Sequence, residues 1–510
     1  MPRLVCPAKE SRRDRAKRRY MIEVIVNRPS FEYDIHSLVK AFFPREDVSV
    51  RVQEAFTEET KIRISLHFTD DKIHIALLEH GGEKQAGADD ICYRDRKETK
   101  DRMKRLLYRI LQAYTGQSLP WGTLTGIRPT RLAMLMLEEG MSNVEAAKNM
   151  REKYYASKEK AALSVMIANR ERYVLRDIDY QHGYSLYVGI PFCPSTCLYC
   201  SFTSYPLSKW EKRMDEYMDA LCKELDYLAH RFRKKKLNTV YIGGGTPTTL
   251  SPERMDRLLT KIQGSFDTSY LQEFTVEAGR PDSITREKLQ VLLDHHIDRI
   301  SINPQTMNDE TLKVIGRHHT VQQVKDAFHL AREMGFCHIN MDLIVGLPGE
   351  GYDDVAHTME EIRALDPDSV TVHSLASKRA ARLNLLKEKY EEMGMENNMQ
   401  IMDLTARCCA EMGLSPYYLY RQKNMAGNFE NVGYAKVDKA GIYNILIMEE
   451  KQTILAAGAG AMTKFVSPGR PGDFGGVKIE RVENVKDVGQ YISRIDEMIE
   501  RKERFFTEHM

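Results

Sequence analysis

Strand-like and helix-like runs alternate six times between Ser185 and Asn384, and this alternation constrains the fold more than any other feature of the chain. Short apolar runs, each followed by an amphipathic run, are typical of βα units that build a parallel sheet. The expected strands are 185–192, 239–243, 274–278, 299–303, 339–345 and 369–374. The expected helices are 209–231, from 252, 285–295, within 308–335, 353–365 and from 384. Six units are fewer than the eight of a complete barrel, so the sequence predicts an α/β fold with a partial barrel.

The first expected strand leads directly into three cysteines, Cys193, Cys197 and Cys200, with the spacing Cys-x3-Cys-x2-Cys. Three thiolates suit a [4Fe–4S] cluster that leaves one iron open to a small ligand. A structural zinc site needs four ligands, and the following Ser201 and Phe202 supply none. A redox dithiol needs only Cys-x-x-Cys and would leave Cys193 unexplained. The spacing therefore favours a cluster over zinc or a dithiol.

Glycines and polar side chains follow the other expected strands, at the end of the barrel where βα loops gather. The second strand ends in Gly243-Gly244-Gly245-Thr246, where backbone N–H groups can approach an anionic ligand closely. An ionised Asp342 inside an apolar strand needs a partner, because an unpaired buried charge is costly. The other candidates in these loops are Glu277, Gln305 and Arg317. These groups predict a ligand site beside the cysteines.

The stretch from Gly183 to Leu383 resembles the radical S-adenosylmethionine (SAM) family of oxygen-independent coproporphyrinogen III oxidases, also called coproporphyrinogen dehydrogenases. The motifs LYVGIPFCPSTCLYC, GGGTPT and DLIVGLPGE and the Gln305–Arg317 spacing match its pattern in order. AAGAGAMT at 456–463 is the best match after Leu383. The resemblance is greatest to a longer branch with an added N-terminal region. It implies a partial (βα)6 radical-SAM barrel with an N-terminal α+β domain and a C-terminal α+β extension.

This resemblance also implies cofactors, site residues and an activity. The three cysteines would hold a [4Fe–4S] cluster that binds SAM and splits it to a 5′-deoxyadenosyl radical, and the barrel would hold two SAM molecules. The implied contacts are Tyr187, Gly244, Glu277 and Ala376 for the first SAM, and Gly245, Thr246, Gln305, Arg317 and Asp342 for the second. The implied reaction is oxidative decarboxylation of two propionates of coproporphyrinogen III to vinyl groups, giving protoporphyrinogen IX in haem biosynthesis.

Two positions depart from the oxidase pattern. Phe202 stands where the oxidases carry a further cysteine, and Gly189 where the pattern usually has histidine. Related haem chaperones also lack that cysteine, but they carry a histidine-asparagine pair where this chain has Tyr443-Asn444. A haem-binding chaperone on the same barrel is therefore one alternative, and an enzyme acting on another tetrapyrrole is a second. The side chains considered as axial haem ligands are His318, His319, His373 and Tyr443.

Composition bounds the partners and the location of the protein. Its 75 Lys and Arg against 73 Asp and Glu give a net charge of +2, so no global field directs it to nucleic acid or membranes. Neither a membrane-spanning run nor a signal peptide is visible. The six cysteines outside the motif suit reduced thiols, so a cytoplasmic location is expected. The protein is also expected to be a monomer. Expected partners are a tetrapyrrole and a flavodoxin- or ferredoxin-type electron donor, with Lys378, Arg379, Arg382 and Arg421 as candidate propionate-binding cations.

Four segments are expected along the chain. Residues 1–20 form a basic arm, expected to be disordered, with Met21 as an alternative start of translation. Residues 21–180 form an α+β domain with strands at 21–26, 61–68 and 72–78 and a helix at 98–114. Its Arg128 and Arg131 are expected at a capped helix start, with binding of propionates or phosphate as the alternative. The barrel occupies 181–390, and 391–510 form a domain that covers the substrate.

Overall fold

The computed structural model describes residues 21–44, 46–52, 56, 60–126, 128–202, 204–376, 383, 393–421, 429–469 and 476–510. They form two compact units. The first comprises the residues up to Pro129 together with Met136–Val165, and the second comprises Thr130–Leu135 together with Met166–Met510. The unit boundary therefore falls inside helix α6 (Lys158–Leu175), before residue 180. None of the helices in the described part of the chain is both long and apolar enough to cross a membrane.

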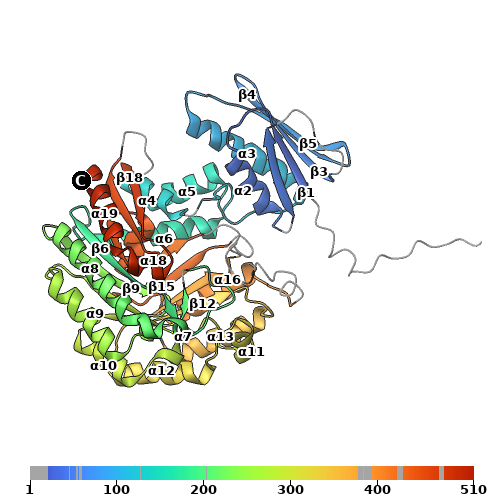
Figure 1. Ribbon diagram of the computed structural model, residues 1–510. Coiled ribbons are helices and arrows are strands. Elements are labelled where there is room, and N and C mark those ends of the chain that lie inside the picture. Colours follow the sequence, from blue (N-terminus) through green and yellow to red (C-terminus); the bar gives the residue numbers. More distant parts are fainter. Residues whose placement is uncertain are drawn as a thin grey trace, which may run out of the picture. The chain divides into compact units, whose positions relative to one another are not determined.

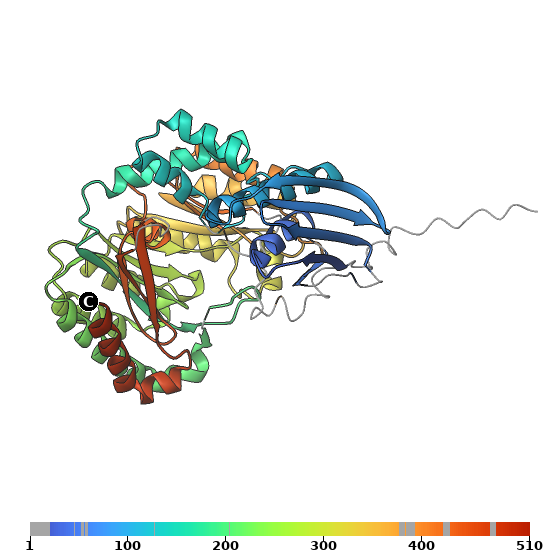
Figure 2. The same ribbon diagram turned by 90° about the horizontal axis from the view of Figure 1, so that it is seen from above.

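The first unit contains a five-stranded sheet in the order β2-β1-β3-β4-β5, drawn as blue arrows in Figure 2. The strands are β1 (Met21–Val26), β2 (Asp47–Val52), β3 (Ile62–Phe68), β4 (Lys72–Glu79) and β5 (Gly82–Asp90). In β3 buried residues alternate with half-exposed ones, so one face is apolar. Helices α2 (Glu32–Phe42) and α3 (Arg96–Thr115) contribute their apolar residues to the same core. The unpredicted β5 has no apolar alternation, which is why the sequence did not reveal it.

The second unit contains an eleven-stranded sheet, and six neighbouring parallel strands of this sheet form the barrel. They are β6 (Gly183–Ile190), β9 (Lys236–Gly244), β10 (Glu273–Gly279), β11 (Arg299–Ile302), β12 (Ile339–Val345) and β13 (Ser369–Ser374). Helices α8 (Met214–Phe232), α9 (Pro252–Ser265), α10 (Arg286–Asp294), α11 (Asp309–Val314), α12 (Val321–Glu333) and α13 (Tyr352–Leu365) connect them and lie outside the strands (Figure 1). The predicted partial barrel is confirmed. The helix expected from Asn384 lies outside the described residues.

The sheet continues beyond the barrel at both edges. β16 (Thr453–Ala457) pairs in parallel with β6 and is followed by antiparallel β17 (Met462–Pro468) and β18 (Val477–Glu483). At the other edge, antiparallel β15 (Asn431–Ala435) and β14 (Ser415–Tyr420) join β13. The C-terminal α+β extension is thus present, and its strands prolong the barrel's own sheet; its role in covering the substrate stays a prediction. The unpaired edges of the barrel supply the backbone groups for this pairing.

The helices of the extension are α16 (Met399–Glu411), α17 (Ile442–Glu449), α18 (Val488–Ser493) and α19 (Ile495–His509). Lys502 of α19 forms an ion pair with Glu224 of α8, and both side chains are fully buried. Glu224 also accepts hydrogen bonds from the backbone N–H of Gly458 (2.9 Å) and the hydroxyl of Tyr491 (2.6 Å). The pair therefore anchors the turn that follows β16 to a helix of the barrel.

Candidate active site

The three cysteines lie in a loop that follows β6 and is held by backbone contacts. The N–H of Leu198 donates to the Ile315 carbonyl oxygen at 2.9 Å, and the Ser195 hydroxyl donates to the Gly316 carbonyl oxygen at 3.0 Å. Burial raises the pKa of the Cys193 thiol to about 11 and also raises that of Cys200. Burial thus disfavours the thiolate form of both side chains, and nearby positive charge or a bound metal favours it.

The donor set fits an iron–sulfur cluster. It consists of three thiols in one loop, near enough that the charges of Cys197 and Cys200 add to the rise in the pKa of Cys193, and that of Cys197 to the rise in the pKa of Cys200. Within the described ranges, no three His, Cys, Asp or Glu side chains are arranged to hold a single metal ion. A four-ligand zinc site is therefore disfavoured, whereas a three-thiolate [4Fe–4S] cluster requires no further side chain.

The glycine run at the end of β9, Gly243-Gly244-Gly245, makes backbone contacts with the end of β6 and the residues that follow it. The N–H of Gly245 donates to the Ile190 carbonyl oxygen, and the N–H of Thr246 to the Phe192 carbonyl oxygen, both at 2.7 Å. A Cβ atom on Gly245 would lie 2.5 Å from the Phe192 oxygen, so no larger residue fits without moving the backbone. The Thr246 hydroxyl lies 3.6 Å from the sulfur of Cys193. The run is therefore contiguous with the cysteine loop.

Glu277, at the end of β10, lies beside three tyrosines. The hydroxyl of Tyr241 donates to its carboxylate at 2.5 Å. The ring of Tyr241 stacks on Tyr443 at 4.5 Å and on Tyr187 at 6.3 Å between centroids. Burial raises the pKa of Glu277 to about 7; the charge of Asp342 also raises it, while the hydrogen bond from Tyr241 opposes the rise. The carboxyl can thus change charge near neutral pH.

Tyr241 was not predicted as a site residue, although a sequence signal for it existed. It pairs in register with Tyr187 across β6 and β9, and it stands two positions before Gly243. Because alternate residues of a strand share a face, a tyrosine at that spacing from the glycine run was a candidate for the barrel interior.

Asp342 lies in the middle of β12, and Gln305 lies in the loop that follows β11 and bridges to β12. Gln305 has the left-handed φ of 70°, and its N–H donates to the Asp342 carbonyl oxygen at 3.0 Å. The Asp342 carboxylate accepts from the amide of Asn340 at 2.8 Å and lies 3.9 Å from His373. Burial alone would raise the pKa of Asp342, but these two neighbours outweigh it and the pKa is lowered. Asp342 therefore offers a negative charge to a ligand.

Arg317 is buried beside the cysteine loop. One guanidinium nitrogen donates to the Asn303 carbonyl oxygen at 2.5 Å. Burial lowers the pKa of this guanidinium, but the neighbouring Tyr199 and Cys197 outweigh it and the pKa is raised. Its position next to a thiol adds a contact that the resemblance did not imply, and the predicted role of Arg317 with a second SAM stays a prediction.

The remaining candidates are placed as follows. Ala376 comes two residues after β13, whereas Lys378, Arg379 and Arg382 lie outside the described residues. Arg421 is buried, which lowers its pKa to about 10. Among the side chains considered as haem ligands, His318 is exposed, His373 is half-buried, and His319 and Tyr443 are buried. Phe202, at the variant cysteine position, is 70% exposed.

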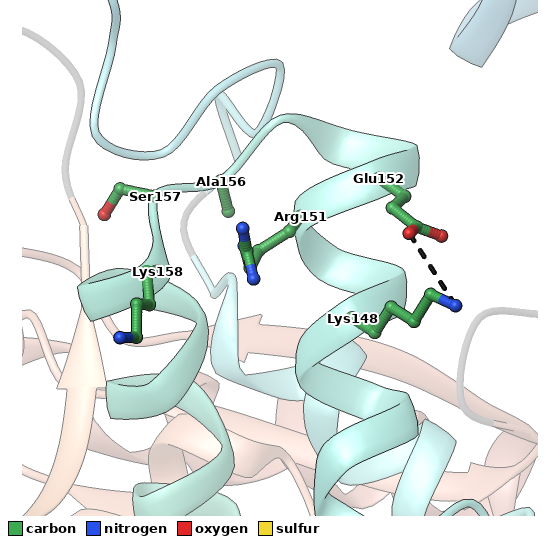
Figure 3. Close-up of a pocket in the computed structure, with 6 residues that line it drawn as sticks. All are labelled: Lys148, Arg151, Glu152, Ala156, Ser157 and Lys158. Carbon is green, nitrogen blue, oxygen red and sulfur yellow. Dashed lines mark ion pairs between the residues drawn. The ribbon is translucent and has the colours of Figure 1, made fainter.

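A separate pocket of about 350 Å³ lies in the first unit between α5 (Asn143–Tyr154) and the start of α6 (Figure 3). Its lining residues are Lys148, Arg151, Glu152, Ala156, Ser157 and Lys158. Lys148 and Glu152 form an exposed ion pair at 3.9 Å. The pocket contains none of the residues implicated by the sequence, so the candidate active site is the cysteine loop and the strand ends around it.

Comparisons with known proteins agree with this geometry. Residues 187–362 match the model of the radical SAM superfamily. The oxygen-independent coproporphyrinogen-III oxidase-like protein HemZ of Bacillus subtilis is 42% identical over 416 residues, which cover 81% of this chain and 82% of that protein. The chain belongs to the radical SAM family of oxygen-independent coproporphyrinogen-III oxidase-like proteins. Membership of the radical SAM superfamily implies a [4Fe–4S] cluster and SAM as cofactors.

Other relatives of this radical SAM protein carry a different name. The haem chaperone HemW of Lactococcus lactis is 37% identical over 229 residues, which cover 44% of this chain and 59% of that protein. The chain thus spans less than two thirds of that chaperone. The solved structure of coproporphyrinogen III oxidase (HemN) from Escherichia coli matches with a TM-score of 0.50 and 22% identity, over 62% of this chain and 70% of that one. This likeness supports the shared fold.

Proposed function

We propose that the protein catalyses the oxidative decarboxylation of two propionates of coproporphyrinogen III to vinyl groups, giving protoporphyrinogen IX. The observation that carries this proposal is a site in which the Thr246 hydroxyl lies 3.6 Å from the Cys193 sulfur, while the barrel strands β10 and β12 carry the neighbouring carboxylates of Glu277 and Asp342. The relative that matches four fifths of the chain is named as oxidase-like.

In the proposed reaction, each residue has a role that follows from its position. Cys193, Cys197 and Cys200 would hold the cluster, and the cluster and SAM, when bound, would supply the radical chemistry that removes a hydrogen atom from the propionate β-carbon. The carbon–carbon bond to the carboxylate then breaks, CO₂ leaves, and one electron passes to an acceptor. The chain binds and orients SAM and the substrate and excludes water. We propose two SAM molecules and a flavodoxin- or ferredoxin-type electron donor.

Glu277 is proposed to bind the ammonium group of the first SAM, which predicts a pH-dependent affinity. Below about pH 7 the carboxyl is protonated and loses its attraction for a cation. The dissociation constant for SAM, measured by anaerobic equilibrium dialysis, should rise by about tenfold per pH unit below that value. Glu277→Gln should bind SAM weakly at all pH values. An unchanged pH profile in the variant would remove Glu277 from this role.

Gly245 is proposed to keep the glycine run close to SAM. Gly245→Ala should slow 5′-deoxyadenosine formation on the order of 100-fold, because its Cβ would displace the backbone by about 1 Å. Gly264→Ala in α9 is the matched control, since a Cβ there meets no atom within 4 Å. Both rates are measured anaerobically with SAM and dithionite by chromatography. Equal rates in the two variants would contradict the proposed cradle.

Asp342 is proposed to bind the second SAM. Asp342→Asn should then reduce porphyrin turnover more than it reduces SAM cleavage in the absence of a substrate, because the first SAM is left in place. Both activities are measured on the same reconstituted sample. Equal losses of the two activities would argue for a single SAM site.

A haem chaperone is the second candidate function, favoured by the HemW relatives and by Phe202 at the variant cysteine position. Against it, Tyr443 is only 4% exposed and its ring stacks on Tyr241. In this position its hydroxyl is poorly placed to ligate a haem iron. One anaerobic assay separates the candidates: reconstituted protein, SAM, reductant and coproporphyrinogen III, with products identified by chromatography, in parallel with haem titration. Turnover supports the oxidase. Tight haem binding without turnover supports the chaperone.

A further inference from the structure

The buried side chain of Arg280 contacts both the cysteine loop and the carboxylate of Asp282. Arg280 follows β10 and is 3% exposed. One terminal nitrogen of its guanidinium lies 2.7 Å from the Ser195 hydroxyl, 3.3 Å from the Ser195 carbonyl oxygen and 4.0 Å from the sulfur of Cys197. Its other two nitrogens donate to the two carboxylate oxygens of Asp282, at 3.0 and 2.7 Å. The planar fork therefore has a fixed orientation.

Asp282 has few other partners. Its side chain is 20% exposed, and the nearest additional group is His319, whose ring nitrogen lies 4.0 Å from the carboxylate. His319 is fully enclosed, and neither of its ring nitrogens has a hydrogen-bond partner among the described residues. Arg280 and Asp282 thus form a dipole whose positive end points at the cysteine loop.

This orientation matters because charge and hydrogen bonds near the sulfurs set the reduction potential of an iron–sulfur cluster. Reduction adds one electron to the cluster, so a nearby fixed cation stabilises the reduced state. Arginine is always charged in proteins, and burial weakens the screening of its field by water.

We infer that Arg280 is a positioning residue that raises the reduction potential of the cluster, by holding the Ser195–Cys197 segment and placing its cation at the Cys197 sulfur. Asp282 limits this effect by partly neutralising the cation. The inference rests on the cluster of the proposed function and not on its tetrapyrrole substrate.

The test measures the midpoint potential of the reconstituted cluster in the full-length protein by anaerobic redox titration, followed by electron paramagnetic resonance. Arg280→Gln removes the cation and should shift the potential to more negative values. Asp282→Asn removes the opposing charge and should shift it to more positive values. Arg286→Gln is the control: Arg286 is 56% exposed and pairs with Glu333 at 2.8 Å on the outer helices. The midpoint potential of the Arg286→Gln variant should equal that of the wild type.

Opposite shifts in the two variants support the inference, because a purely structural loosening of the loop would move both potentials in the same direction. Shifts in one direction, or no shift in either variant, overturn it. If Arg280→Gln takes up no iron, the Asp282→Asn potential decides, since an unchanged value overturns the inference and a positive shift supports it. Failure of the wild type to take up a cluster would instead refute the proposed function.

Discussion

Replacing any one of Cys193, Cys197 and Cys200 with alanine should abolish the iron–sulfur cluster and all SAM cleavage. Each thiol is one of the three cysteine ligands of the loop, and a [4Fe–4S] cluster held by three thiolates loses a required ligand when one of them is removed. Iron and sulfide analysis after anaerobic reconstitution should give about four irons per chain for the wild type and close to none for each variant.

Cys222→Ala and Cys408→Ala are the matched controls. These half-buried thiols lie on α8 and α16, away from the loop, so both variants should keep full iron content. A wild-type protein that takes up zinc in place of iron under these conditions would contradict the cluster assignment.

Lys502→Met should lower the free energy of unfolding of the second unit by about 3–5 kcal/mol. The substitution leaves the fully buried Glu224 without its cation and removes the ammonium donor to the Ala456 carbonyl oxygen. Glu224 keeps the hydrogen bonds from Gly458 and Tyr491, but these neutral groups cannot balance its charge. The turn after β16 should loosen together with the packing of α19 on α8.

Urea unfolding measures this loss. The chain has two tryptophans, and Trp121→Phe leaves Trp210, in the second unit, as the reporter. Lys223→Ala is the control because Lys223 joins the same two helices through an exposed pair with Asp496 at 2.5 Å. Its cost should be about 0–1 kcal/mol. Equal costs for the two substitutions would show that burial does not govern the contribution of the pair.

The sequence predicts the barrel strands well because each is a short apolar run with its own turn signals. β12 and β13 have the predicted bounds, Ile339–Val345 and Ser369–Ser374. The placement of the C-terminal strands could not be predicted, because pairing of β16 with β6 joins segments about 270 residues apart and depends on which sheet edge is open.

In the site, too, features encoded in a short stretch of sequence could be predicted, whereas contacts between distant segments could not. The Cys-x3-Cys-x2-Cys spacing carries its own chemistry, so the sequence alone was sufficient to identify it. The contact of Arg280 with Ser195 depends on how the β10 loop folds back over the cysteine loop. Likewise, the stacking of Tyr443 on Tyr241 joins α17 to β9. No short sequence pattern predicts this contact, because the two tyrosines lie far apart in the chain.

The most direct test of the proposed reaction follows a single hydrogen atom. Reconstituted protein is reduced anaerobically with SAM and coproporphyrinogen III deuterated at the propionate β-carbons, and the 5′-deoxyadenosine is analysed by mass spectrometry. The proposed function predicts one deuterium in each 5′-deoxyadenosine formed and vinyl groups in the tetrapyrrole product. Unlabelled 5′-deoxyadenosine with unchanged coproporphyrinogen III would contradict it.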